Sequence, residues 1–140
     1  MPELATWRLI FRKGVAPQLS VYELLALQAG LQKNDPAIIQ GQTTRPDAIG
    51  LNRREEPRQC CPVAYAIWKS ADNIPGITVG EVDEEFAKVC AKCDQALGYE
   101  RSIRHFLNWV DDTPRTEMIR DLLAELVLAT TARSMELPAA

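Results

Sequence analysis

The chain has 140 residues, a length typical of one domain, and 46% of them are apolar, which is enough for a hydrophobic core. The net charge of -3 gives no general attraction for a polyanion, so nucleic acid is not an expected partner. No stretch approaches the roughly 18 uncharged apolar residues of a membrane span, and the first residues lack the pattern of a secretory signal. We therefore expect a single helical domain over residues 1–140, located in the cytoplasm, with no membrane partner.

The N-terminal segment 1–18 is predicted to be an extended arm or a short strand. Trp7, Leu9 and Phe11 alternate with other residues over a run that ends at Gly14. A lone strand leaves its backbone groups unpaired, so this arm would pair with another segment or with a second copy of the chain. The alternative is an extended segment that lies over the helices. Trp7 is therefore a candidate partner-binding residue.

Two capping boxes give the clearest helix starts. Ser20-Val21-Tyr22-Glu23 and Thr78-Val79-Gly80-Glu81 each place a hydroxyl three residues before a glutamate, and apolar residues at helical spacing follow both. They predict one helix that ends between residues 30 and 34 and a second that ends at Gly98. Further helices are expected after Asp35-Pro36, after Pro62, over residues 102–110 and after Thr113-Pro114. The fold class is thus all-α, a compact bundle of about five to six helices, with a flexible tail over residues 135–140.

A polar loop is expected over residues 41–59, where the helical pattern breaks down. Only Ile49 and Leu51 are available to anchor it. Connections longer than about 12 to 15 residues without secondary structure are usually functional or disordered. The loop holds four arginines that could bind an anion or an acidic partner, namely Arg45, Arg53, Arg54 and Arg58. The alternative is a solvated segment in which arginine and glutamate neutralise each other.

The four cysteines are expected to be free thiols or metal ligands, as is usual in a reducing compartment. Cys90 and Cys93 have the spacing of a thiol-disulfide motif. However, the capping box starts their helix about ten residues earlier, beyond the one turn over which the helix dipole stabilises a thiolate. Both cysteines also fall on the apolar face of that helix. We therefore expect buried thiols with raised pKa values.

A zinc site is the alternative role for the cysteines. Four tetrahedral ligands could come from Cys60, Cys61, Cys90, Cys93 and His105. The adjacent pair Cys60-Cys61 lacks the two-residue separation that is common in zinc sites. Two hypotheses therefore remain. In one, the chain is a zinc-binding or thiol-dependent redox protein. In the other, its cysteines only pack in the core.

The leading functional hypothesis is a small protein-interaction or adaptor module that forms a homodimer. There is no phosphate loop, dinucleotide-binding fingerprint, His-Glu-x-x-His pair or nucleophile elbow, and the hypothesis includes no enzymatic activity and no cofactor. The predicted partner is another protein, because three tryptophans lie at or beside apolar faces and aromatic residues are enriched in interfaces. The predicted partner-binding residues are Arg45, Arg53, Arg54, Arg58 and Trp7. A nucleic-acid regulator that uses the same arginines is a weaker alternative, which the negative net charge disfavours.

Overall fold

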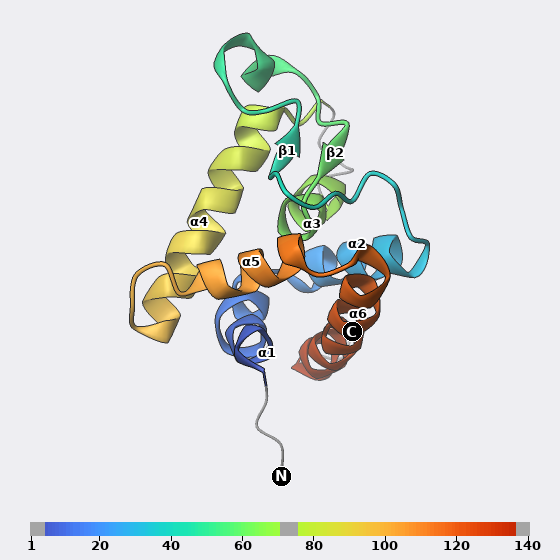
Figure 1. Cartoon of the computed structure of the whole chain (residues 1–140), viewed down its shortest axis with the longest axis vertical. Coiled ribbons are helices and arrows are strands. Elements are labelled where there is room, and N and C mark those ends of the chain that lie inside the picture. The colour runs from blue at the N-terminus through green and yellow to red at the C-terminus, as the bar shows by residue number, and fades with distance from the viewer. Residues whose placement is uncertain (1–4, 71–75, 137–140) are drawn as a thin grey trace.

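The computed structural model describes residues 5–70 and 76–136, and helices account for most of this part of the chain (Figure 1). The α-helices are α1 (Thr6–Ile10), α2 (Val21–Gln32), α3 (Pro62–Ser70), α4 (Val79–Leu97), α5 (Ile103–Asp112) and α6 (Arg115–Glu136). A π-helical turn, η1 (Phe11–Val15), and two 3-10 turns, η2 (Ala16–Gln18) and η3 (Gly50–Arg54), complete the helical elements. The strands β1 (Thr44–Arg45) and β2 (Gln59–Cys60) pair antiparallel. The predicted all-α class is therefore confirmed.

Both predicted capping boxes are present. The Ser20 Oγ accepts a hydrogen bond from the Glu23 N–H at 3.1 Å, and the Glu23 carboxylate accepts one from the Ser20 N–H at 2.8 Å. Thr78 and Glu81 make the same pair of bonds at 3.2 and 3.1 Å. At the other end of α4, Gly98 has φ 83°, a left-handed conformation that glycine adopts without strain. These local signals fix the start of α2 and both ends of α4 as predicted.

The predicted extended arm is wrong for residues 6–18, which are helical, while residues 1–4 lie outside the described residues. The buried side chains of this segment recur at helical spacing: Trp7, Ile10, Phe11 and Val15. Leu9, which a strand would have placed beside Trp7 and Phe11 on one face, is 39% exposed. The apolar residues of this segment fit both the period of a strand and that of a helix. Packing against the rest of the protein favours the helix.

The predicted helix after Asp35-Pro36 is also wrong, because tertiary hydrogen bonds take its backbone groups. The Asp35 carboxylate does accept from the Ala37 N–H at 2.9 Å, as a cap would. Ile38, however, forms a parallel bridge with Cys60. The Arg115 guanidinium donates to the Asp35 and Ile38 carbonyls at 2.9 and 2.6 Å. The segment is therefore a turn followed by a short extended stretch.

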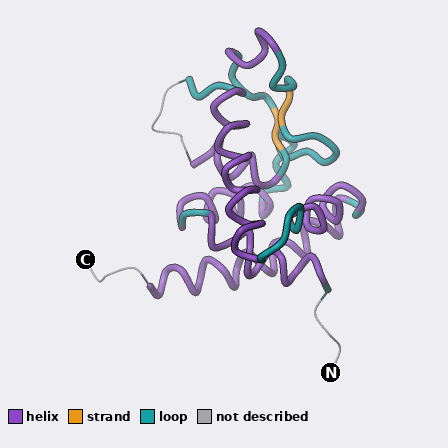
Figure 2. The backbone as a smooth tube through the Cα atoms, turned by 90° about the vertical axis from the view of Figure 1, so that its left-hand side faces the viewer, coloured by secondary structure: helices purple, strands orange, loops and turns teal. Residues whose placement is uncertain are grey.

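The C-terminal helix is longer than predicted. α6 runs to Glu136, so the expected tail over residues 135–140 does not begin at Met135. Residues 137–140 lie outside the described residues. In Figure 2, α6 forms the long helix at the base of the molecule that leads to the C-terminus. No helix in the described ranges combines the length and apolar character needed to cross a bilayer.

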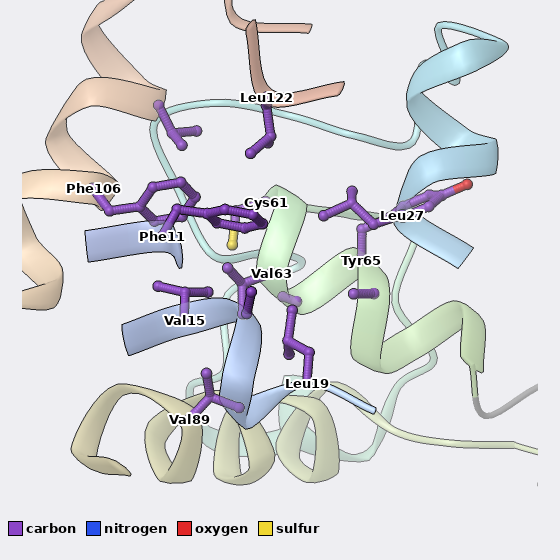
Figure 3. Close-up of a cluster of buried hydrophobic side chains, with 14 of the residues drawn as sticks. Phe11, Val15, Leu19, Leu27, Cys61, Val63, Tyr65, Val89, Phe106 and Leu122 are labelled. Carbon is purple, nitrogen blue, oxygen red and sulfur yellow. The ribbon is translucent and has the colours of Figure 1, made fainter. Parts of the chain in front are cut away.

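The core is built around α3, whose residues 62–67 are all buried. α2 and α4 pack against this helix, and β2 leads into it. Side chains from several elements meet beside α3 in Figure 3, among them those of Phe11, Phe106 and Leu122. The rings of Phe11 and Phe106 have centroids 5.5 Å apart, a favourable spacing for tilted aromatic rings. η1, α5 and α6 thus contribute to the same core as α3.

A buried carboxylate joins the N-terminal segment to α6. Glu125 is only 2% exposed, and it accepts hydrogen bonds from Arg8 Nη1 at 2.8 Å and from Arg12 Nη2 at 3.0 Å. The hydrogen bonds from Arg12 lower the pKa of Glu125 below its ordinary value, and the one from Arg8 acts in the same direction, against the opposing effect of burial. The ionised carboxylate therefore stabilises the folded chain.

We predict that Glu125→Gln lowers the free energy of unfolding by about 1 to 3 kcal/mol near neutral pH, because two charge-assisted hydrogen-bond donors lose their ionised acceptor. Since the folded-state pKa of Glu125 is depressed, this contribution is present above the ordinary value of 4.5 and is lost as the pH falls below it. Urea unfolding at a series of pH values measures the difference between the variant and the original chain, which should shrink in acid.

Glu117→Gln is the matched control, since Glu117 lies on the same helix with its side chain 53% exposed. We expect it to change the unfolding free energy by less than about 0.5 kcal/mol. Equal destabilisation by the two substitutions would show that the buried ion pairs of Glu125 make no special contribution.

Candidate functional site

The candidate site is the surface of segment 41–59, which lies at the top of Figure 1 beside the start of α4. Its two ends are joined by the β1 and β2 pairing, with Thr44 opposite Cys60 and Arg45 opposite Gln59. The Cys61 N–H also donates to the Thr43 carbonyl at 2.8 Å, directly before α3 begins. The segment is mostly irregular, but it also contains β1, η3 and the first residue of β2, and its base is fixed to the central helix.

Arg53 holds the middle of the segment against α4 through ion pairs and hydrogen bonds. Its guanidinium lies 3.3 Å from the Asp83 carboxylate and 3.5 Å from that of Glu84. It also donates to the Gly80 and Ala48 carbonyls, at 3.3 and 3.2 Å. The hydrogen-bonding groups of Arg53 are thus used inside the chain. Arg53, a predicted partner-binding residue, therefore positions the segment.

The close approach of η3 to α4 depends on Gly80. A Cβ at this position would lie 3.0 Å from the Arg53 carbonyl oxygen, which is backbone and has little freedom to move. The Glu55 carbonyl accepts a hydrogen bond from the Val79 N–H at 2.8 Å in the same region. A glycine in the first turn of α4 therefore allows the segment to sit against the helix.

The outer part of the segment exposes two large aliphatic side chains. Ile49 is 71% exposed and Leu51 is 77% exposed, so the expectation that they anchor the loop is wrong. Arg54 and Arg58 are also exposed, and within the described part of the chain their side chains make no hydrogen bond or ion pair. Together with the exposed acidic residues between these arginines, they form the loop surface, defined as Ile49, Leu51, Arg54, Glu55, Glu56 and Arg58.

Two other predicted partner-binding residues make contacts within the chain. Arg45 is exposed, but its guanidinium donates to the side-chain oxygens of Gln42 and Gln59 at 3.1 and 3.3 Å. Trp7 is only 8% exposed, and its ring stacks on that of Trp109 with centroids 3.5 Å apart. α1, which carries Trp7, lies far from segment 41–59 in Figures 1 and 2. Trp7 is therefore a core residue.

All four cysteines are free thiols, and burial raises their pKa values. The pKa rises to about 12 for Cys60, Cys61 and Cys93, which are 0%, 6% and 0% exposed. Cys90 is half-buried, and burial raises its pKa to about 11. The prediction of inward-facing thiols is confirmed for Cys93, whereas Cys90 lies at the wall of a pocket. At neutral pH such thiols are protonated and are poor nucleophiles.

The candidate zinc ligands do not converge. Cys61 and Cys90 line one pocket, but Cys93 lies against Gly14, where an added Cβ would come within 2.5 Å of its sulfur. Cys60 is on β2, and His105 is exposed on α5. Among residues 5–70 and 76–136, no group of three or more histidine, cysteine or acidic side chains is placed to hold a metal ion.

Comparison of the chain with models of protein families, with curated proteins and with solved structures found no match. The geometry of the molecule separates the predicted arginine cluster into two pairs. Arg45 and Arg53 are engaged within the segment or with α4, whereas the exposed side chains of Arg54 and Arg58 make no hydrogen bond or ion pair in the described part of the chain. The structure also shows that Ile49 and Leu51 are exposed, which no pattern in the sequence predicts.

We predict that Cys90 is the first cysteine modified when the native protein reacts with N-ethylmaleimide. The other three thiols should react at least about tenfold more slowly, because they are buried and their thiolates are rarer at neutral pH. The rate at Cys90 should continue to rise with pH toward its pKa of about 11. Mass spectrometry of peptides measures each site, and Cys90→Ala should remove only the fast reaction. Equally fast modification of Cys61 or Cys93 would contradict the burial described above.

Proposed function

We propose that this chain is a protein-interaction module and that the loop surface is its binding site. The observation that carries the proposal is the exposure of Ile49 and Leu51, at 71% and 77%, on a segment held in place by Arg53. Exposed apolar side chains with a polar rim are a feature of protein-binding surfaces. Because the segment is already ordered, binding costs less conformational entropy than it would for a mobile loop. Loops on a rigid scaffold commonly carry binding function.

The charges of the loop surface support a second copy of this chain as the partner. Arg54 and Arg58 flank Glu55 and Glu56, so the surface carries both signs around its apolar residues. In a two-fold symmetric interface, the same surface is presented by both copies, and a residue on one copy meets a different residue on the other. Such pairing would place arginines opposite glutamates. The proposed dimer therefore forms through the loop surface and not through an N-terminal arm.

We also propose a cytoplasmic location, which the four free thiols support, because a reducing compartment keeps cysteines unpaired. The proposed activity needs no cofactor. The alternative of a zinc-binding or thiol-dependent protein has less support, since the candidate ligands are dispersed and burial raises every thiol pKa.

We predict that sedimentation equilibrium detects a dimer and that Ile49→Asp together with Leu51→Asp raises its dissociation constant at least about tenfold, because two charges enter the apolar centre of the interface. Tyr22→Asp is the matched control, since Tyr22 is 72% exposed on α2, outside the loop surface. It should leave the constant unchanged within about twofold. A chain that stays monomeric at about 100 μM, or equal effects of the two changes, would overturn the dimer.

A charge exchange tests the pairing itself. We expect Arg54→Glu with Arg58→Glu to weaken self-association several-fold through like-charge repulsion, and Glu55→Arg with Glu56→Arg to do the same. Mixing the two variants should restore association, because opposite charges then meet across the interface. Sedimentation of the mixture measures this recovery. If the mixture is as weak as each variant alone, the proposed pairing of arginine and glutamate is incorrect.

A partner other than a second copy gives a different result. In that case, the chain would be monomeric in solution. When immobilised, it would retain a protein from a cell extract. The Tyr22→Asp variant would retain the same protein, and the variant with Ile49→Asp and Leu51→Asp would not. Retention of the same proteins by all three chains would place binding outside the loop surface.

A further inference from the structure

A pocket of about 400 Å³ lies between α4, α5 and the residues that lead into α3. This volume is within the range of about 300 to 1,000 Å³ that is typical of small-molecule sites. Gly41, Gln42 and Thr43 line one side, and Pro62 lines the pocket where α3 begins. The apolar and thiol side chains along its wall include Phe86, Cys90, Phe106, Leu107 and Val110. The loop surface does not contribute to this pocket, so the two sites are separate.

Two cationic side chains at the pocket are free to bind a ligand. Arg101 and Arg104 line the pocket and are exposed. Within residues 5–70 and 76–136, neither guanidinium makes a hydrogen bond or an ion pair. A guanidinium group binds a carboxylate through two parallel hydrogen bonds, which makes arginine a suitable residue for recognising that group.

The acidic residues of the pocket are already engaged by hydrogen-bond donors. The Asp94 carboxylate accepts from the Arg101 and Ile103 N–H groups at 2.9 Å each, and from Ser102 Oγ at the same distance, at the start of α5. Asp111 accepts from the Gly41 N–H at 2.9 Å. These bonds satisfy both carboxylates. At the end of the pocket that holds Asp94, the two arginine cations outnumber the one acid.

The charges are also separated along α5. Arg104, Leu107 and Asp111 follow one face of this helix at spacings of three and four residues, so about 10 Å of helix separates the cation from the acid. Asp111 acts electrostatically on Cys61, whereas Asp94 and Arg104 act on Cys90, so Asp111 lies away from the end of the pocket that holds the cations and Asp94. At about 10 Å, one Debye length at moderate salt, Asp111 repels an anion beside Arg104 only weakly.

We propose that this pocket binds a small molecule that carries a carboxylate on an apolar body. The carboxylate meets Arg104 and Arg101, and the apolar part lies against Phe86, Leu107 and Val110. The half-buried thiol of Cys90 forms part of the contact surface. This proposal is independent of the protein-binding role of the loop surface.

Octanoate is the test ligand, with octanol as the uncharged compound of matched length. Isothermal titration calorimetry on the full chain should detect one saturable octanoate site, and octanol should bind at least about tenfold more weakly because it lacks the carboxylate. Arg104→Gln should weaken octanoate binding at least about tenfold. Lys92→Gln removes the same charge from an exposed position on α4 that does not line the pocket, and it should change affinity less than about twofold.

Protection of Cys90 gives a second readout at the pocket wall. Saturating octanoate should slow the reaction of Cys90 with iodoacetamide, an uncharged reagent, at least about threefold in the original chain and in Lys92→Gln. It should not protect Cys90 in Arg104→Gln at the same concentration. The proposal is overturned if octanoate fails to saturate up to about 10 mM, if Arg104→Gln and Lys92→Gln bind it equally, or if bound octanoate leaves the reaction of Cys90 unchanged.

Discussion

Burial of α3 on all sides is the constraint on which the rest of the structure depends. Residues 62–67 form an unbroken buried run, and a helix without a polar face has to lie at the centre of a domain. α2 and α4 cover it, and the chain enters it through β2 with the Cys61 N–H bonded to the Thr43 carbonyl. The pocket lies beside Pro62 at this entrance, and the base of segment 41–59, which carries the loop surface, is joined to it through β1 and β2. The entrance to one apolar helix thus holds the base of segment 41–59 and forms part of the wall of the pocket.

Elements whose signals are local could be predicted from the sequence, and elements decided by distant contacts could not. The capping boxes at Ser20 and Thr78 need only residues three positions away, and both helices begin where expected. The first eighteen residues fit period 2 and helical spacing equally well. In the folded chain this segment is helical, and Trp7 stacks on Trp109, which lies far along the sequence. After Asp35, a correct local cap is outweighed by the bridge between Ile38 and Cys60.

The same distinction applies to the candidate sites. The arginine-rich character of segment 41–59 is evident from composition, but the use of Arg53 as an anchor depends on Asp83, thirty residues away on α4. The outward position of Ile49 and Leu51 follows from the path of the segment over Gly80. Inward-facing Cys93 could be predicted from helical spacing alone. That Cys61 and Cys90 share a pocket could not, because it requires the packing of α3 on α4.

The ion pairs of Glu125 have a consequence for synthesis of the chain. Arg12 and Glu125 are 113 residues apart, so the N-terminal helical segment leaves the ribosome long before its partner on α6 exists. The Trp7 ring likewise has no stacking partner until Trp109 has been synthesised. During this interval the nascent chain exposes aromatic surface that the folded domain covers, and native packing of α1 waits until Trp109 and Glu125 are available. The packing of α1 and η1 in the native fold is therefore completed by residues that are synthesised more than one hundred positions later.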